Sequence, residues 1–275
     1  MERLHFTYEM DIEYSTPVGR CNYTIKCIPE NTKRQKIEGV TVSLFPDTKY
    51  SYGRDGLGNL QLYGVNEEEH KLFKFWIEGY ATVGLDDHED EYNDNLDMVF
   101  KHPHGLNTAG DKIKEYYEQL KLDGIIVNGE EAREDKSVKE ISPLEQAIQV
   151  MHSLHQDFAY EACITDVNTS AEEAFAQGKG VCQDYAHIFI SLMHLTGIAA
   201  RYVTGLIVGE GASHAWVEVL SDGKWYGLDP TNDSIVGEEH IKIGIGRDAK
   251  DCCINRGIMH GGGLHTQTIR VNVTK

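Results

Sequence analysis

The sequence predicts an α+β fold made of an N-terminal antiparallel β-sandwich and a core in which a helix packs on an antiparallel sheet. Two observations lead to this prediction. Apolar and polar residues alternate with a period of two through about the first hundred residues, as in half-buried strands. Further along, apolar residues at helical spacing give way to new strand-like runs. We place the boundary at Gly105, with an N-terminal domain of residues 1–105 and a second domain of residues 106–275.

The N-terminal strands are visible in the alternation itself. Every second residue is apolar from Phe6 to Tyr14, and again from Cys21 to Cys27. Val40–Leu44 and Leu72–Ile77 add two more strand-like runs, while the glycine-rich stretch Gly53–Asn59 is typical of a turn. Short strands separated by turns favour a β-sandwich.

Helical patterns follow the boundary, the first at Ala109–Leu122. Ser142 to Glu145 form a capping box with proline at the first helical position, so a helix starts there. A short helix is expected at Ala171–Gln177 and a longer one from Cys182 to Gly197, a C-cap signal. The strands expected after these helices are Arg201–Val208, Ala215–Leu220, Trp225–Leu228, Ile241–Ile245 and Thr266–Val273.

Composition narrows the choice of partners. The chain has 275 residues, 40% of them hydrophobic and 25% charged, as in a soluble globular protein, with a formal net charge of −18. Nucleic acid and anionic membranes both require a basic surface, so neither is an expected partner. The acidic balance is compatible with cationic substrates, but we base no prediction on it. Met1–Thr7 runs into a strand pattern without the apolar stretch of a leader, and no run reaches transmembrane length.

The six cysteines do not form the pattern of a disulfide framework or a zinc site. Cys252 and Cys253 are adjacent, and Cys21 and Cys27 are six positions apart. We therefore expect reduced thiols and a cytoplasmic location.

Two segments resemble metal sites but lack the full pattern. The acidic loop of residues 86–97 has no glycine at the sixth position and no glutamate at the twelfth position of an EF-hand, so a solvated loop is expected. His102 and His104 have no third ligand nearby and are interpreted as part of a polar linker. We expect no metal and no cofactor.

The most informative segment is Gly178–Ala186, in which glycines lead into Cys182 and an apolar, helix-like run comes next. This arrangement puts the Cys182 thiol at the first turn of a helix. Free N–H groups and the helix dipole favour a thiolate there, which is the nucleophilic form of cysteine. A lone cysteine is more often a small buried hydrophobe, so the assignment depends on partner residues later in the chain.

Two later segments supply the partners that a reactive thiol needs. His214 lies at the start of a predicted strand, where its ring can reach a cleft and act as general base and acid. Asp229 ends the next strand and is suited to orient the histidine ring. The alternative interpretations are a core histidine and a turn aspartate preceding Pro230.

At these residues the chain resembles the transglutaminase-like superfamily of cysteine enzymes. The segments around Cys182, His214 and Asp229 are similar to the three motifs of that family, in the same order. The resemblance extends from about Ser142 to the C-terminus and is greatest to a bacterial branch assigned as cysteine proteases, which carry a β-rich N-terminal region. It implies a papain-like, transglutaminase-type core.

The oxyanion-stabilising groups are less defined by the sequence. The backbone N–H of Cys182 is the natural first donor, and Gly180 lets the backbone approach a substrate carbonyl. The resemblance suggests Gln156 or Tyr160 for a second donor; a surface glutamine and a packed tyrosine are the alternatives. His187 and His194 are interpreted as structural. His240, His260 and His265 are not assigned a role.

The expected function is cysteine-dependent acyl chemistry on a peptide or protein amide, through a thioester on Cys182. Hydrolysis of a peptide or isopeptide bond is the first choice. Transfer to an amine, as in a protein-glutamine transglutaminase, is the second. The rivals outside enzymology are a non-catalytic interaction module and a redox-sensing thiol, and a pairing of His214 with Asp229 would argue against the latter.

Overall fold

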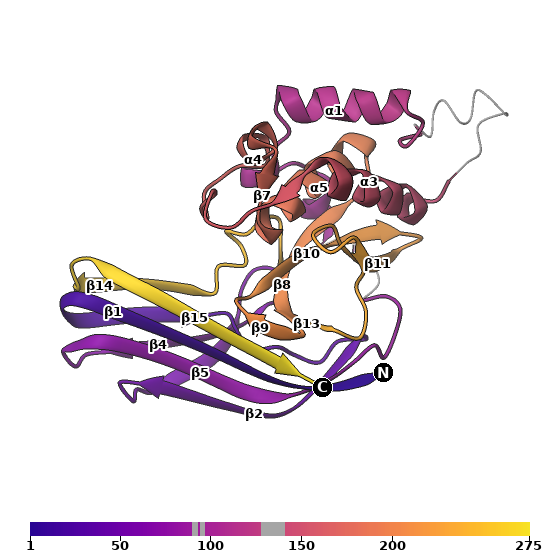
Figure 1. Ribbon diagram of the computed structural model, residues 1–275. Helices are drawn as coiled ribbons and strands as arrows, with labels where there is room; N and C mark the ends of the chain where they lie inside the picture. The colour runs from indigo at the N-terminus through magenta and orange to yellow at the C-terminus, as the bar shows by residue number, and fades with distance from the viewer. Residues whose placement is uncertain (90–92, 94–96, 128–140) are drawn as a thin grey trace.

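The computed structural model describes residues 1–89, 93, 97–127 and 141–275. These residues form one large curled antiparallel sheet, a smaller antiparallel sheet seated against it, and helices on the far side of the smaller sheet (Figure 1). None of the described helices has the length and apolar content needed to cross a membrane.

The curled sheet is built around β1 (Glu2–Ile25), which pairs along one edge with β5 and along the other with β15. The other strands of this sheet are β2 (Gln35–Phe45), β3 (Tyr50–Arg54), β4 (Leu60–Asn66), β5 (His70–Val83), β9 (Gly209–Gly211), β14 (Asn255–Gly261) and β15 (His265–Thr274). The predicted α+β class is therefore correct. The predicted β-sandwich is not: the N-terminal region is a half-barrel formed by one sheet.

A physical reason for the difference lies in what covers the buried face of β1. Phe6, Tyr8 and Met10 are fully buried on that face, as the alternation predicted. Their hydrophobic cluster also includes Leu206 and Ile241, which belong to the smaller sheet. The apolar side of the curled sheet thus packs on the other half of the molecule and needs no second N-terminal sheet.

The strands of the two predicted domains are not separated at residue 105. β14 and β15 come after the smaller sheet in the chain, yet both pair with β1 in the curled sheet. β9 also joins this sheet by pairing with β15. The C-terminal strands therefore connect the predicted second domain to the first.

The smaller sheet has the order β12-β11-β10-β8-β13. Its bounds are β8 (Ala200–Ile207), β10 (His214–Ser221), β11 (Lys224–Asp229), β12 (Ser234–Ile235) and β13 (His240–Gly246). The helix α5 (Cys182–Thr196) packs on this sheet and contributes the buried side chains Ile188, Phe189 and Leu192 to the shared core. A helix on an antiparallel sheet is the predicted architecture.

The other helices are α1 (Asp111–Leu122), α3 (Pro143–Asp157) and α4 (Ala171–Gln177), with short 3-10 turns η1 (Asp97–Lys101) and η2 (Gly105–Asn107) before them. The capping box predicted at Ser142 is present, because its hydroxyl accepts from Glu145 N and the Glu145 carboxylate accepts from Ser142 N. Gly197 closes α5 with a positive φ of 79°, as its C-cap signal indicated.

Buried charges hold the strands of the smaller sheet in register. Glu218 on β10 lies 2.6 Å from Arg201 Nε on β8 and 2.7 Å from Lys242 Nζ on β13. Burial alone would raise the pKa of Glu218, but Lys242 and Arg201 lower it to about 2. The carboxylate is therefore ionised inside the protein and joins three strands.

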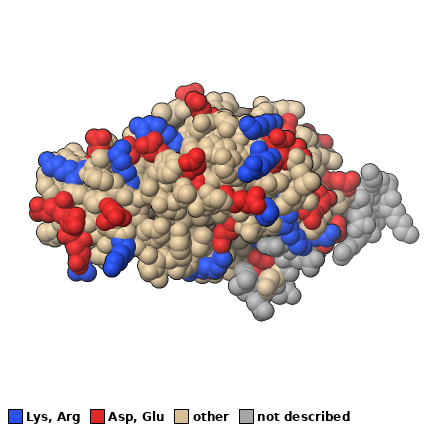
Figure 2. All heavy atoms as spheres, turned by 90° about the horizontal axis from the view of Figure 1, so that it is seen from below, with Lys and Arg blue, Asp and Glu red and all other residues tan. Residues whose placement is uncertain are grey.

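The underside of the curled sheet carries Lys and Arg side chains interspersed with Asp and Glu, around an uncharged middle (Figure 2). Within the acidic loop of residues 86–97, residues 90–92 and 94–96 lie outside the described residues. His88 Nδ1 contacts the carboxylates of Asp86 and Asp87 at 3.0 and 2.8 Å. These are mutual ion-pair contacts within an exposed loop.

Candidate active site

Cys182 begins α5, as predicted, and its side chain is half-buried. The helix start is fixed by Asp184, whose Oδ2 accepts from Val181 N at 2.8 Å and from the Thr165 hydroxyl at 2.7 Å. Gly180 is required here because a Cβ would lie 2.5 Å from that same carboxylate oxygen. Gly180 therefore makes room for the helix cap, in addition to any role toward a substrate.

His214 starts β10 and Asp229 ends β11, so the two strands bring the side chains together at one end of the smaller sheet. His214 Nε2 lies 2.7 Å from Asp229 Oδ2. Asp229 is fully buried, and its other oxygen accepts from the backbone N–H of Thr231 and of Asn232. This turn fixes the carboxylate toward the histidine ring.

The Cys182 thiol is near enough to the His214 ring to be among the groups that raise the pKa of the ring. Because Nε2 faces Asp229, the nitrogen left for the sulfur is Nδ1. Burial lowers the pKa of His214, but the interactions with Asp229 and Cys182 outweigh it and raise the pKa to about 10. The imidazolium is thus stabilised between the two groups. The structure brings together the three residues that the sequence analysis singled out.

The Asp229 carboxylate is kept ionised despite its burial. Burial raises its pKa, yet hydrogen bonds from His214, His240 and Asn232 lower it well below the ordinary value. A permanent negative charge at this position favours the imidazolium form of His214 over the neutral ring.

Two contacts to Asp229 were not predicted. His240 Nε2 lies 3.1 Å from Asp229 Oδ2, and Asn232 Nδ2 donates to the same oxygen at 2.8 Å. The Trp216 ring packs edge-on against His240 at 5.3 Å and lies 6.2 Å from the His214 ring. Asn232 stands in the third motif and could have been proposed. His240 lies at the start of β13, and only the pairing of β13 with β8 brings it here.

His214, Asp229 and His240 also offer three metal-ligating atoms within 4.8 Å of one another. Two ligands on a tetrahedral zinc, at its usual bond lengths, are about 3.3 Å apart. The 2.7 Å between His214 Nε2 and Asp229 Oδ2 is shorter and is an ordinary hydrogen-bond distance. The cluster is therefore arranged as a hydrogen-bonded network around one carboxylate.

The two candidates for a second oxyanion donor lie differently. Tyr160 is on β6 (Ala159–Tyr160), which pairs in parallel with β7 (Lys179–Gly180) directly before Cys182. Its side chain is 60% exposed. Partial burial and, next, the Cys182 charge raise its pKa, which places it within electrostatic reach of the thiol. Gln156 is exposed near the end of α3, and no hydrogen bond of its side chain is found among the described residues.

The remaining histidines of this region have structural contacts. His187 is fully buried, and its Nε2 accepts from Ala249 N at 3.1 Å. His194 Nε2 lies 3.0 Å from the carbonyl oxygen of Phe100. His260 and His265 belong to β14 and β15 in the curled sheet.

Known proteins are similar to this chain in its core and in its overall fold. Residues 132–230 match the model of the Transglutaminase-like superfamily, so this core is similar to that superfamily. An uncharacterized protein of Mycobacterium tuberculosis is 26% identical over 94% of this chain and 88% of its own length. An uncharacterized protein of Mycobacterium leprae is 38% identical, over 40% of this chain and 43% of its own length.

A solved structure shares the whole fold. It is described as "a Putative Cysteine Protease from Cytophaga hutchinsonii", and it aligns with a TM-score of 0.73 over 100% of this chain and 91% of its own. The sequence identity is 18%, so this likeness concerns the fold alone.

Proposed function

We propose that this protein is a cysteine-dependent hydrolase that cleaves a peptide or isopeptide bond with Cys182, His214 and Asp229. The observation that carries the proposal is the position of the His214 ring. Nε2 lies 2.7 Å from a buried carboxylate, and the Cys182 thiol at a helix start is among the groups that raise the pKa of the ring. Nucleophile, base and orienting group are the set that thiol-dependent acyl transfer requires.

In the first half-reaction the Cys182 sulfur attacks the amide carbonyl carbon, and its proton is held on His214. The negative charge on the carbonyl oxygen develops beside the N-terminus of α5, where backbone N–H groups stabilise it. When the carbon–nitrogen bond breaks, the leaving amine takes the proton from His214. The product is a thioester on Cys182.

In the second half-reaction His214 removes a proton from water as the water oxygen attacks the thioester carbonyl. The carbon–sulfur bond then breaks and a carboxylic acid leaves. Cys182 is regenerated either as the thiol, by taking the proton from His214, or as a thiolate paired with the His214 imidazolium. Asp229 keeps one ring tautomer and one ring orientation throughout, without itself taking the proton.

Tyr160 is proposed as the side-chain donor to the oxyanion, in preference to Gln156. Its position beside the segment that leads into Cys182, and its electrostatic coupling to the thiol, support this choice. Replacement of Tyr160 with Phe removes the hydroxyl and keeps the ring, so it tests the donor without removing the packing.

The experiment is a peptide digest of casein incubated with the enzyme in ¹⁸O-labelled water and millimolar dansylcadaverine. Mass spectrometry then reads two products from one thioester. A new carboxylate carrying ¹⁸O supports hydrolysis, and dominant dansyl incorporation supports a transglutaminase instead. Cys182→Ala is the control and should give neither product. If the wild type also gives neither and no acyl group is found on Cys182, the interaction-module alternative gains support.

A further inference from the structure

A groove with a volume of about 410 Å³ begins beside the proposed catalytic pair. Gln183, which comes directly after Cys182, and Ser213, which precedes His214, both line it. Tyr202 of β8 forms another part of its wall. Burial and, next, the Cys182 charge raise the pKa of Tyr202, so the thiol lies within electrostatic reach of the groove. The groove is therefore lined by the chain neighbours of Cys182 and His214, although these two residues are not themselves part of its wall.

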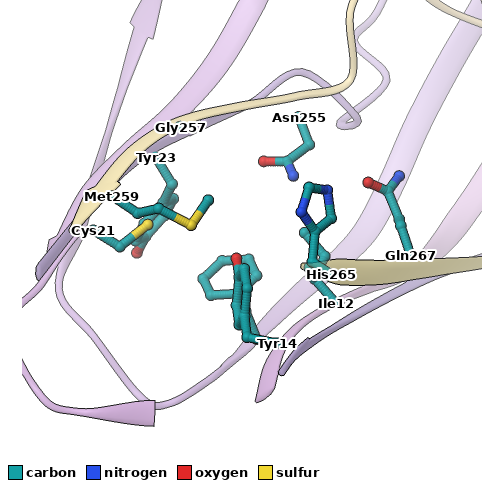
Figure 3. Close-up of a pocket in the computed structure, with 10 residues that line it drawn as sticks. Ile12, Tyr14, Cys21, Tyr23, Asn255, Gly257, Met259, His265 and Gln267 are labelled. Carbon is teal, nitrogen blue, oxygen red and sulfur yellow. The ribbon is translucent and has the colours of Figure 1, made fainter. Parts of the chain in front are cut away.

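The opposite wall comes from the curled sheet. Asn255 and Arg256 of β14, and Gln267 and Ile269 of β15, line the groove. Asn255 and Gln267 also border a cavity of about 50 Å³ on the buried face of β1, where their amide groups lie on either side of the His265 ring (Figure 3). The smaller cavity has room for water only. The larger groove is the space next to the active site that can hold a substrate segment.

This wall also offers a strand edge. β14 and β15 each pair with β1 on one side. On the other side, β9 pairs only with residues 271–273, and no further strand of the described residues covers residues 255–270. An uncovered strand edge can form backbone hydrogen bonds with an extended peptide.

The charge of the groove differs from that of the whole chain. The sequence contains 44 acidic residues against 26 Lys and Arg. The groove is lined by Lys250 and Arg256 and by no Asp or Glu among the described residues. Both cations are exposed, and neither forms a salt bridge with a described carboxylate. Arg256 donates to the backbone carbonyl of Lys250, so its guanidinium lies beside the residue that carries the other cation.

The neighbouring carboxylates have other partners. Asp251 is held by Arg247 at 2.7 Å, and Asp248 is buried and accepts from the backbone N–H of Leu106 and Lys250. Asp166, which precedes the lining residue Val167, accepts from Asn168 N. The two cations are thus available to a ligand.

We propose that this groove binds the part of the peptide substrate that flanks the scissile amide, in an extended conformation, and that Lys250 and Arg256 select a carboxylate on that part. This inference depends on the proposed function, because it assigns the substrate class of the same site. The composition of the whole chain is acidic, whereas the local charge at the groove favours anionic substrates. The acidic residues on the rest of the protein repel anions, so an anionic substrate binds less at other parts of the surface.

The test uses alkylating peptides in place of an unidentified substrate. N-chloroacetyl derivatives of glycine, diglycine and triglycine are prepared as free acids and as amides, and the rate of Cys182 alkylation is measured by intact mass. The acid should react about threefold to tenfold faster than the matching amide for at least one length, and the ratio should fall as salt is added. The amide of each pair corrects for the intrinsic reactivity of the thiol.

The double variant Lys250→Gln/Arg256→Gln should bring the ratio close to one. Arg20→Gln/Lys71→Gln removes the same charge from exposed positions on the curled sheet and should keep the wild-type ratio. A wild-type ratio of one or less at every length, or a high ratio that survives in the groove variant, would overturn the inference. If Cys182 is alkylated with this selectivity but the protein hydrolyses no peptide, the result contradicts the proposed function and leaves the groove inference standing.

Discussion

His240 Nε2 lies 3.1 Å from Oδ2 of Asp229, the carboxylate oxygen that also accepts from His214. The candidate site is therefore larger than three residues. One buried oxygen receives two imidazole rings and the amide of Asn232. His240 touches no reacting group directly, so its effect must pass through Asp229, and we regard it as a positioning residue.

Replacing His240 with Phe should slow the alkylation of Cys182 by iodoacetamide about tenfold, because the carboxylate loses one of the donors that fix it toward His214. The replacement keeps an aromatic ring beside Trp216. The rate should regain most of its value in His240→Gln, which restores a donor. Equal rates in wild type and His240→Phe across pH 5 to 9 would remove His240 from the network.

Asp229→Asn should leave the fold intact and decrease hydrolytic turnover on the order of a hundredfold or more, because the neutral amide no longer stabilises the imidazolium and no longer selects one tautomer. Circular dichroism and the melting temperature serve as the control for folding. Near-wild-type turnover in this variant would show that another group orients His214.

Cys182 should be the thiol most rapidly labelled by iodoacetamide near neutral pH, since it lies at a helix start beside His214. Cys163 is the thiol that competes with Cys182 for the reagent, because it is exposed, whereas Cys21, Cys27 and Cys252 are buried. Peptide mapping after brief labelling separates the sites. In His214→Ala the preference for Cys182 over Cys163 should be lost; a preference for Cys163 in the wild type would contradict the assignment.

The His214–Asp229 pair should also make stability depend on pH in a defined direction. The pKa of His214 is raised from 6.5 to about 10, so its contribution is fully present below pH 6.5 and is lost as pH rises through about 10. The pKa of Asp229 is lowered, so its contribution is present above pH 3.8 and is lost at more acidic pH.

The melting temperature of wild type should therefore exceed that of His214→Gln by roughly 5 °C or more between about pH 4 and 6.5, and the difference should shrink toward pH 10. Calorimetry of both proteins over this range checks the result. A difference that stays constant from pH 5 to pH 10.5 would mean that the charge on His214 contributes nothing to stability.

Glu218→Gln should destabilise the protein by about 3 kcal/mol, because it removes the buried charge shared by Arg201 and Lys242. The effect should be present above pH 4.5 and vanish only as pH falls through about 2. Denaturant unfolding gives the value. Glu67→Gln is the matched control, since its contact with Arg20 is exposed, and it should change the stability by less than about 0.5 kcal/mol.

The sequence was sufficient to predict those features that depend on residues close together in the chain. The capping box at Ser142 fixes a helix start within a few residues and is present, and the short helix expected at Ala171–Gln177 has the predicted bounds. Cys182, His214 and Asp229 each stand in a short segment whose element could be predicted, so their convergence resulted from packing one helix on one sheet.

The parts that were missed depend on pairing between distant residues. Nothing near Asn255–Gly261 specifies that it pairs with residues 18–25, and the same is true of His240 and Asp229. The half-barrel was mistaken for a sandwich because alternation identifies a buried face without saying what buries it. Here the covering side chains, such as Leu206 and Ile241, come from the other half of the molecule.

The pairing of β1 with β15 has a consequence for biosynthesis. His5 lies opposite Thr274, so residues near the two ends of the chain become neighbours in one ladder. On the ribosome, β1 is made well before β15, so that edge stays uncovered until β15 has been translated. During the wait its long, alternating edge can pair with other nascent chains. We therefore expect the nascent protein to engage chaperones until β15 has been made, and a variant starting near Gly105 to lack the partner of β15 and to aggregate.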